Sequence, residues 1–252
     1  RDDIDALTFT PLGSDTPMSW KEALGANYTD AIVVLHKGKI VYERYMGVTT
    51  PASQHIAFSV TKSYIGTLAA SLAAEGKLDP DKLVTDYVPE LADSGFAGAT
   101  VRHVMDMTTG IAFDETYTNA DADIIRHARA GRAAPRRANY DGPDGFLAFL
   151  PTIGKQGEHG ERFTYRTANT DALGWVIARA TGKSVGDNVQ ERIWSKLGAE
   201  QDAYFAIDSV GTEFAGGGLN TGLRDLARFG EMMRLDGRFN GQQIVPKAVV
   251  DD

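Results

Sequence analysis

The chain of 252 residues contains no cysteine. This absence excludes disulfide bonds, catalysis by a thiolate, and zinc or iron–sulfur sites with cysteine ligands. Because no disulfide has to form, the default compartment that we expect is the cytoplasm.

Long apolar runs and an excess of basic residues are also missing. The longest apolar stretches fall well short of the roughly 18 residues that a membrane-spanning helix needs. The chain has 34 acidic and 26 basic residues and a net charge of −8, which argues against a protein that follows a polyphosphate backbone. Residues 1–5 are acidic, do not resemble a signal peptide and lack an initiator methionine. We therefore expect the numbering to start inside a longer gene product.

The residues that are present have the composition of a globular protein, with 42% hydrophobic and 24% charged residues. Two strand-like runs on either side of a glycine predict a β-hairpin at 31–35 and 40–44. Apolar residues spaced by three and four predict helices. These helices cover 59–75, 100 to before 110, 170–180, a segment that starts at Ser184, and 223–234. A strand is predicted at 204–207, and 244–250 is typical of a helix start.

This order of elements predicts a mixed α/β protein with an inserted helical part. Residues 1–65 and 200–252 would form the α/β domain, and residues 66–199 the helical domain. Few strands are predicted for a complete sheet, so we expect the α/β domain to be incomplete in this chain.

Ser59 and Lys62 carry the strongest chemical signal. Ser59 lies at the predicted helix start and Lys62 one turn later, so both side chains lie on the same face. A serine hydroxyl is a poor nucleophile unless a base takes its proton, and a lysine amine can be that base only in its neutral form. The backbone N–H of Ser59 can also donate to an oxyanion. On spacing alone, a helix-capping serine followed by a solvated lysine is the favoured interpretation.

The surrounding segments change that balance. The string Ala-Phe-Ser-Val-Thr-Lys-Ser at 57–63 is followed by Ala-Glu-Gly-Lys-Leu-Asp at 74–79 and by Gly-Gly-Gly-Leu at 216–219. With these segments the chain resembles the class C-like branch of the serine β-lactamase and penicillin-binding-protein family over residues 31–252. Within that branch it is most similar to the 6-aminohexanoate-dimer hydrolases, enzymes that degrade nylon oligomers and have esterase activity. That similarity lies in segments 158–161, 165–175 and 224–233.

The resemblance implies a β-lactamase-like fold, in which an antiparallel sheet has flanking helices and an inserted helical domain. It also implies that Ser59 is the nucleophile and Lys62 its base. The third motif of the family, Lys-Thr-Gly or a variant on an edge strand, supplies the second oxyanion N–H and is not found. The nearest string, Thr181-Gly182-Lys183, has the wrong order and lies between two predicted helices. We therefore expect the C-terminal strands of the sheet to be missing from this chain.

Two tyrosines complete the candidate site. The family motif Tyr-x-Asn corresponds to Tyr165-Arg166-Thr167, with Thr167 in place of the asparagine. The resemblance implies that Tyr165 passes protons to the leaving group and activates the deacylating water; the alternative is a tyrosine packed at a helix start. Tyr117 occupies a position that contacts the scissile amide in the resembled enzymes, with a lid or packing role as the alternative.

Other patterns have simpler explanations. The string 182–186 matches G-x-S-x-G, but a helix precedes it where that motif needs a strand, so helix caps explain Gly182 and Ser184. A phosphate-binding loop is excluded because Ile177 stands where its first glycine must be. Five arginines favour a solvated helix end and loop, with attraction of carboxylate-bearing substrates as the alternative. They are Arg126, Arg129, Arg132, Arg136 and Arg137. The five histidines form no metal motif, so we expect no metal.

Together these observations predict a serine hydrolase that cleaves linear amides of the 6-aminohexanoate-oligomer type and carboxylesters through an acyl-enzyme. Ser59, Lys62 and Tyr165 would be its catalytic residues, with no metal or organic cofactor. The expected partner is a small amide or ester substrate rather than nucleic acid or membrane, and a homodimer is compatible with the resemblance. The alternatives left open are a β-lactamase, a D-Ala-D-Ala peptidase, and a non-catalytic binding or sensor protein of the same fold.

Overall fold

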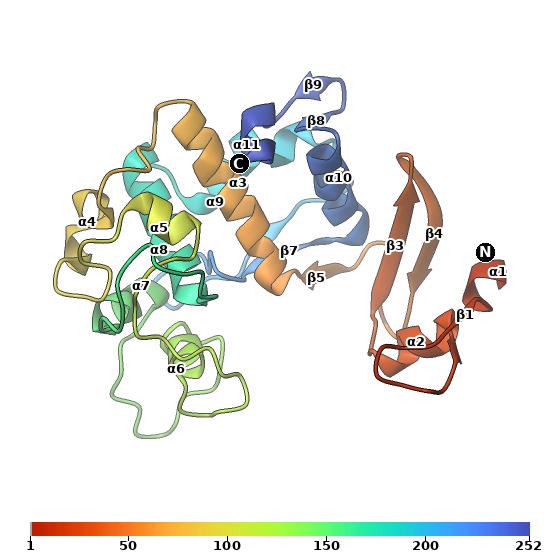
Figure 1. Ribbon diagram of the computed structural model, residues 1–252, viewed down its shortest axis with the longest axis horizontal. Coiled ribbons are helices and arrows are strands. Elements are labelled where there is room, and N and C mark those ends of the chain that lie inside the picture. The colour runs from red at the N-terminus through yellow and green to blue at the C-terminus, as the bar shows by residue number, and fades with distance from the viewer. Residues whose placement is uncertain (1) are drawn as a thin grey trace.

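The computed structural model describes residues 2–252. Arg1, the first residue of the acidic N-terminal segment, lies outside the described part. The chain folds into a helix-rich body and a β-hairpin that lies to one side of it (Figure 1). Within residues 2–252, no helix is long and apolar enough to cross a lipid bilayer.

The N-terminal part ends in the predicted β-hairpin, which is confirmed. Strands β3 (Ala31–His36) and β4 (Lys39–Tyr45) pair antiparallel with an irregularity at Val34/Leu35. The turn residues Lys37 and Gly38 have φ values of 50° and 73°. Two consecutive left-handed residues are the turn geometry that matches the twist of paired strands. The elements before the hairpin are α1 (Asp2–Asp5), β1 (Thr8–Phe9), β2 (Met18–Ser19) and α2 (Trp20–Ala26).

The middle of the chain is helical, as predicted, and is introduced by one strand. Strand β5 (Gln54–Ile56) leads into the 3-10 turn η1 (Phe58–Val60) and helix α3 (Thr61–Ala74). The elements that follow are α4 (Val84–Tyr87), η2 (Pro89–Leu91), α5 (Val101–Met105), α6 (Asp123–Ala130), α7 (Phe146–Phe149), η3 (Leu150–Thr152), α8 (Thr167–Thr181), α9 (Val185–Arg192) and η4 (Trp194–Lys196).

The last part of the chain supplies two further strands of a small sheet. Strand β7 (Leu219–Gly222) lies between β5 and β6 (Tyr204–Phe205) and pairs antiparallel with both. Because every residue of β7 is buried, it lacks the polar alternation that marks a half-buried strand, and the sequence analysis missed it. The chain then continues as α10 (Leu223–Arg234), β8 (Arg238–Phe239), β9 (Gln242–Gln243) and α11 (Lys247–Asp251).

Several predicted boundaries need correction. The helix predicted from 100 to before 110 ends at Met105, and the strand predicted at 204–207 ends at Phe205. The predicted α/β character is confirmed, but the sheet is divided: hairpin β3–β4 and the three strands β5, β7 and β6 belong to separate sheets. The division into 1–65 with 200–252 and 66–199 stays a prediction.

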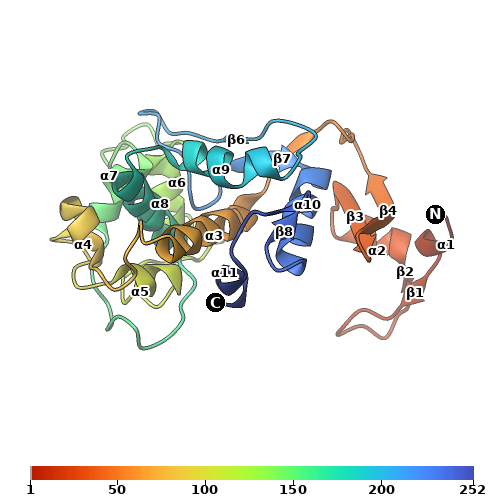
Figure 2. The ribbon, with the colours of Figure 1, turned by 90° about the horizontal axis from the view of Figure 1, so that it is seen from above.

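Helix α3 forms the centre of the core. Tyr64, Ile65, Leu68 and Leu72 are fully buried on one face, at the spacing of three and four that a single helix face requires. This face packs against α8 and α9, and Figure 2 shows α3 passing beneath α9 through the middle of the body. Burial of each large aliphatic side chain contributes about 1.5–3 kcal/mol. The packing thereby fixes the N-terminal end of α3, where Ser59 and Lys62 lie.

A bidentate ion pair ties the hairpin to the body. Arg224 of α10 donates to both carboxylate oxygens of Glu43 on β4, at 2.6 and 2.9 Å. These hydrogen bonds hold the pKa of Glu43 below its usual range. A carboxyl whose pKa is lowered by folding stabilises the protein above its unfolded pKa, and this stabilisation is lost as the pH falls.

We expect Glu43→Gln to lower the free energy of unfolding by about 1 kcal/mol at pH 7.5. The difference from the unsubstituted protein should shrink as the pH falls below about 4.3, the usual pKa of a glutamate, and should vanish once the pH lies below the lowered pKa of folded Glu43. Thermal melts at pH 7.5 and at about pH 3 measure both effects. Glu191→Gln is the matched control, because its pair with Lys183 is half exposed and should change the melt little. Equal destabilisation by Glu43→Gln at both pH values would contradict the role of the charge.

Candidate active site

Ser59 lies in the turn η1, between strand β5 and helix α3. The interpretation of Ser59 as a helix cap is wrong, because α3 is capped by Val60 and no side chain caps η1 or α3. The preceding residue, Phe58, has a φ of 43°, in the left-handed region that bulky side chains rarely adopt. Hydrogen bonds to β7 hold this turn: Ala57 N–H donates to the carbonyl of Leu219 and Leu219 N–H donates to Thr61 Oγ1. The strained turn therefore presents Ser59 to solvent.

The three predicted catalytic side chains come together at the Ser59 hydroxyl. Lys62 Nζ lies 3.1 Å from Ser59 Oγ, and the Tyr165 hydroxyl lies 2.6 Å from the same oxygen. Lys62 Nζ also lies 5.1 Å from the centre of the Tyr165 ring. Two groups that can exchange protons thus contact one hydroxyl, which is the arrangement that activates a serine nucleophile.

Gly216 holds the lysine from the other side. Lys62 Nζ donates to the Gly216 carbonyl at 2.5 Å, and the Gly216 N–H donates to Asp171 Oδ1 at 2.9 Å. A Cβ on residue 216 would lie 2.5 Å from Thr167 Cγ2 and 3.0 Å from Asp171 Oδ2, so only glycine fits. In the sequence analysis, residues 216–219 only helped to identify the family resemblance, and no role was predicted for them. Asp171 was not among the predicted site residues.

Tyr165 is positioned by the two residues that follow it. Arg166 is buried and donates to the Thr109 carbonyl at 3.0 Å; burial and the nearby Arg162 lower its pKa. Thr167, at the asparagine position of the family motif, donates from both its N–H and its hydroxyl to the Glu115 carboxylate, at 2.9 and 2.5 Å. The Glu115 carboxylate therefore lies at the N-terminus of helix α8, where the helix dipole stabilises a negative charge. The sequence analysis did not single out Glu115.

Tyr117 also binds Glu115. Its hydroxyl donates to Glu115 Oε1 at 2.8 Å, and 62% of the residue is exposed. Desolvation of the hydroxyl and the hydrogen bond to the charged Glu115 raise the pKa of Tyr117 to about 12. Tyr117 and Thr167 therefore share one carboxylate at the edge of the site, and Tyr117 is a hydrogen-bond donor at neutral pH.

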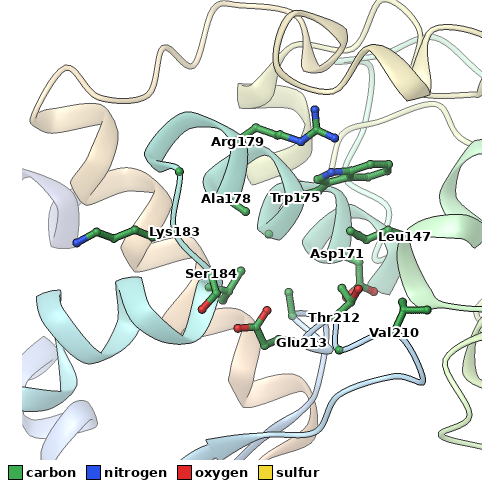
Figure 3. Close-up of a pocket in the computed structure, with 15 residues that line it drawn as sticks. Leu147, Asp171, Trp175, Ala178, Arg179, Lys183, Ser184, Val210, Thr212 and Glu213 are labelled. Atoms are coloured by element: carbon green, nitrogen blue, oxygen red, sulfur yellow. The ribbon is translucent and has the colours of Figure 1, made fainter.

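Ser184, the serine of the G-x-S-x-G string at 182–186, lies between helices α8 and α9. Gly182 ends α8 with a left-handed φ of 68°, and Ser184 caps α9 through the Asp187 N–H, so the helix-cap explanation is confirmed. Ser184 lines a cavity of about 410 Å³ with Trp175 and Glu213 (Figure 3). Within residues 2–252, the lining of this cavity includes neither Ser59 nor Lys62 nor Tyr165. It does include Asp171, which accepts the Gly216 N–H.

The arginine cluster is largely paired with carboxylates. Arg132 and Arg136 form ion pairs with Asp144. Arg137 pairs with Asp121, and Arg126 pairs with Asp123. This pairing favours the simpler interpretation of a solvated, ion-paired surface over attraction of a substrate carboxylate. Within residues 2–252, no three histidine, aspartate or glutamate side chains are grouped so that they could hold a metal ion.

Comparisons with known proteins give matches over most of the chain. The family model described as Beta-lactamase matches residues 22–249. The chain is 37% identical to the 6-aminohexanoate-dimer hydrolase of Paenarthrobacter ureafaciens over 92% of its length, and 28% identical to esterase EstB of Burkholderia gladioli over 71% of its length. A solved structure from Bacillus anthracis, assigned as a 6-aminohexanoate-dimer hydrolase, superposes on 99% of the chain with a TM-score of 0.91 and 35% identity.

The relatives are longer than this chain. It spans 58% of the Paenarthrobacter enzyme, 47% of the Burkholderia esterase and 65% of the Bacillus chain. The fold that these matches share with the chain is the β-lactamase-like α/β fold.

We expect Gly216→Ala to slow the reaction of Ser59 with a fluorophosphonate roughly 100-fold, because the added methyl group displaces the carbonyl that orients Lys62. Labelling rates followed by intact mass spectrometry measure this. Gly230→Ala is the matched control, since a Cβ at that helical position meets nothing within 4 Å. If the Gly216 variant keeps its fold and is labelled as fast as the control, the Gly216 carbonyl does not orient Lys62.

Proposed function

The chain belongs to the beta-lactamase family, and from this premise we propose that it is a serine hydrolase that acts through an acyl-enzyme on Ser59. The observation that carries the proposal is the contact of one exposed hydroxyl with both Lys62 and Tyr165, at 3.1 and 2.6 Å. A binding protein has no need for this arrangement.

Acylation begins with Lys62 in its neutral form. Ser59 Oγ attacks the substrate carbonyl carbon while its proton passes to Lys62 Nζ. The oxyanion of the tetrahedral intermediate accepts a hydrogen bond from the Ser59 backbone N–H, the one oxyanion donor that we assign. The Gly216 carbonyl supports this step because it takes one N–H of the amine and so directs the lone pair at Ser59.

Tyr165 carries the second proton transfer. Its hydroxyl donates to the leaving nitrogen or oxygen as the acyl-enzyme forms, and it then takes a proton from the water that releases the acid. When water hydrolyses the acyl-enzyme, Lys62 Nζ returns its proton to Ser59 Oγ, 3.1 Å away. The ties of Arg166 and Thr167 support the role by fixing the backbone beside Tyr165.

We propose short linear amides of the 6-aminohexanoate-dimer type as substrates, with carboxylesters as side substrates. The relative that is 37% identical carries the name of the amidase and the one that is 28% identical the name of an esterase. Thr167 supports this choice over a β-lactam or D-Ala-D-Ala substrate, since its side chain is engaged with Glu115 and no asparagine is offered at that position.

The remaining assignments come from the sequence and stay predictions. They are action in the cytoplasm, a small molecule as the partner, and assembly as a homodimer. A D-Ala-D-Ala peptidase or β-lactamase would be recognised by the lifetime of its acyl-enzyme with a penicillin.

Incubation with a fluorophosphonate tests the proposed nucleophile. We expect a single adduct, mapped to the peptide that contains Ser59, because this hydroxyl contacts both the proposed base and the proposed proton donor. Lys62→Ala should abolish labelling, and Tyr165→Phe should slow hydrolysis of a p-nitrophenyl ester by roughly 100-fold or more.

Ser184→Ala is the control for the G-x-S-x-G string, and we expect it to leave the labelling of Ser59 unchanged. An unlabelled Ser59 in the folded protein would contradict the hydrolase proposal and favour the binding protein. An adduct on Ser184 would contradict the choice of nucleophile.

Tyr117→Phe tests the second tyrosine. With a pKa of about 12, Tyr117 stays protonated between pH 6 and 10, so it contacts the substrate as a neutral hydroxyl and transfers no proton. We expect the variant to lower kcat/KM for an amide roughly 10-fold, which corresponds to the loss of one hydrogen bond. The dependence of kcat/KM on pH should keep its shape, with each inflection at the same pH as in the unsubstituted protein. Loss or displacement of an inflection in this range would instead assign Tyr117 a proton-transfer role.

A further inference from the structure

A histidine and an aspartate form a buried pair behind the candidate site. His127 of α6 and Asp171 of α8 are 0% and 1% exposed, and His127 Nε2 lies 3.2 Å from Asp171 Oδ2. The two atoms form no well-aligned hydrogen bond: within residues 2–252, neither they nor His127 Nδ1 has a hydrogen-bond partner. Their close approach still pairs two buried polar groups that have lost contact with water.

The pair is connected to Ser59 through three contacts. Asp171 Oδ1 accepts the Gly216 N–H, the Gly216 carbonyl accepts Lys62 Nζ, and Lys62 Nζ contacts Ser59 Oγ. Helix α6 lies at the edge of the body, whereas α3 runs through its centre (Figure 1). A buried side chain at the periphery is thus linked to the central helix that carries the lysine.

The surroundings of His127 indicate which nitrogen carries the proton. Its ring centre lies 5.1 to 6.3 Å from the rings of four phenylalanines, and within residues 2–252 nothing forms a hydrogen bond with Nδ1. These rings belong to Phe113, Phe146, Phe149 and Phe214. An N–H at Nδ1 would be buried without an acceptor, which costs more than an unused lone pair. The proton therefore belongs on Nε2, where it faces the carboxylate.

With this assignment an N–H group lies beside each Asp171 oxygen: Oδ1 accepts the Gly216 N–H at 2.9 Å, and Oδ2 lies 3.2 Å from His127 Nε2. Two such contacts offset the hydration that a buried carboxylate has lost and restrict its rotation. Arg126, the charged neighbour on α6, stacks over Phe149 at 5.8 Å and pairs with Asp123 instead. The orientation of Asp171 in turn positions Gly216, beside which Thr167 and Phe214 leave no space for a Cβ.

We propose that His127 and Asp171 are positioning residues for Lys62, an inference that rests on the proposed function. His127 holds Asp171, Asp171 holds Gly216, and the Gly216 carbonyl directs the lone pair of Lys62 at Ser59. Without the imidazole, the second carboxylate oxygen has no neighbouring N–H, so Asp171 is free to rotate and release the Gly216 N–H. Because removal of one partner of a buried pair also destabilises a fold, the thermal midpoint has to be followed together with the reactivity of Ser59.

Three variants separate positioning from packing. His127→Phe keeps an aromatic ring in the cage but removes the donor, and His127→Gln replaces the donor with a side-chain amide. Phe146→Leu is the matched control, because it disturbs the same cage without touching the pair. The readouts are the labelling rate of Ser59 with a fluorophosphonate, the thermal midpoint, and the ¹⁵N shifts of the His127 ring.

We expect His127→Phe to slow labelling roughly 10- to 100-fold, and His127→Gln to recover part of the loss. Phe146→Leu should stay within about threefold of the unsubstituted protein even where its midpoint falls. The ring shifts should show a neutral imidazole with its proton on Nε2.

Each contrary result has a separate meaning. If the unsubstituted protein is not labelled at Ser59, the proposed function fails, and this inference fails with it. If it is labelled and His127→Phe reacts equally fast, or no slower than Phe146→Leu, the positioning role alone is overturned. Ring ¹⁵N shifts that place the proton on His127 Nδ1 would also overturn the positioning role. This measurement uses the unsubstituted protein, so it does not depend on whether a variant folds.

Discussion

The Lys62 amine stands between the Ser59 hydroxyl and the Gly216 carbonyl, and the rest of the structure serves to keep it there. A primary amine on a four-carbon chain has many conformations, so a single partner would not direct its lone pair. The second partner comes from the segment that runs into β7, the central strand of the small sheet, 154 residues further along the chain. The site is therefore a property of the whole fold rather than of the Ser-x-x-Lys string.

Two structural constraints limit the movement of Ser59, Lys62 and Tyr165. The left-handed turn at Phe58 stores local strain that the surrounding hydrogen bonds to β7 must hold. On the opposite side, Tyr165 is fixed through its neighbours: buried Arg166 binds the Thr109 carbonyl and Thr167 binds Glu115. The proposed nucleophile, base and proton donor are thus each attached to a different packed element, which limits how far any one of them moves alone.

The sequence predicts those parts of the fold whose signals are local. The Lys37–Gly38 turn, the left-handed Gly182 and the Ser184 cap follow from the conformations that these residues favour, and α10 ends where its apolar period ends. Strand β7 could not be found because it is buried on both faces. Ser59, Lys62 and Tyr165 were recognisable from motif and spacing, whereas Glu115, Asp171 and His127 act through contacts between distant segments. A buried histidine among phenylalanines has no periodic or motif signal, so only the tertiary structure shows its link to Lys62.

The central claim is that Ser59 becomes covalently acylated during turnover. Acid quenching of the protein during steady-state hydrolysis of a p-nitrophenyl ester, followed by intact and peptide mass spectrometry, tests this directly. The account predicts a mass increase equal to one acyl group, located on the peptide that contains Ser59 and absent after Ser59→Ala. Turnover that persists in Ser59→Ala, or an acyl group on another residue, would contradict it.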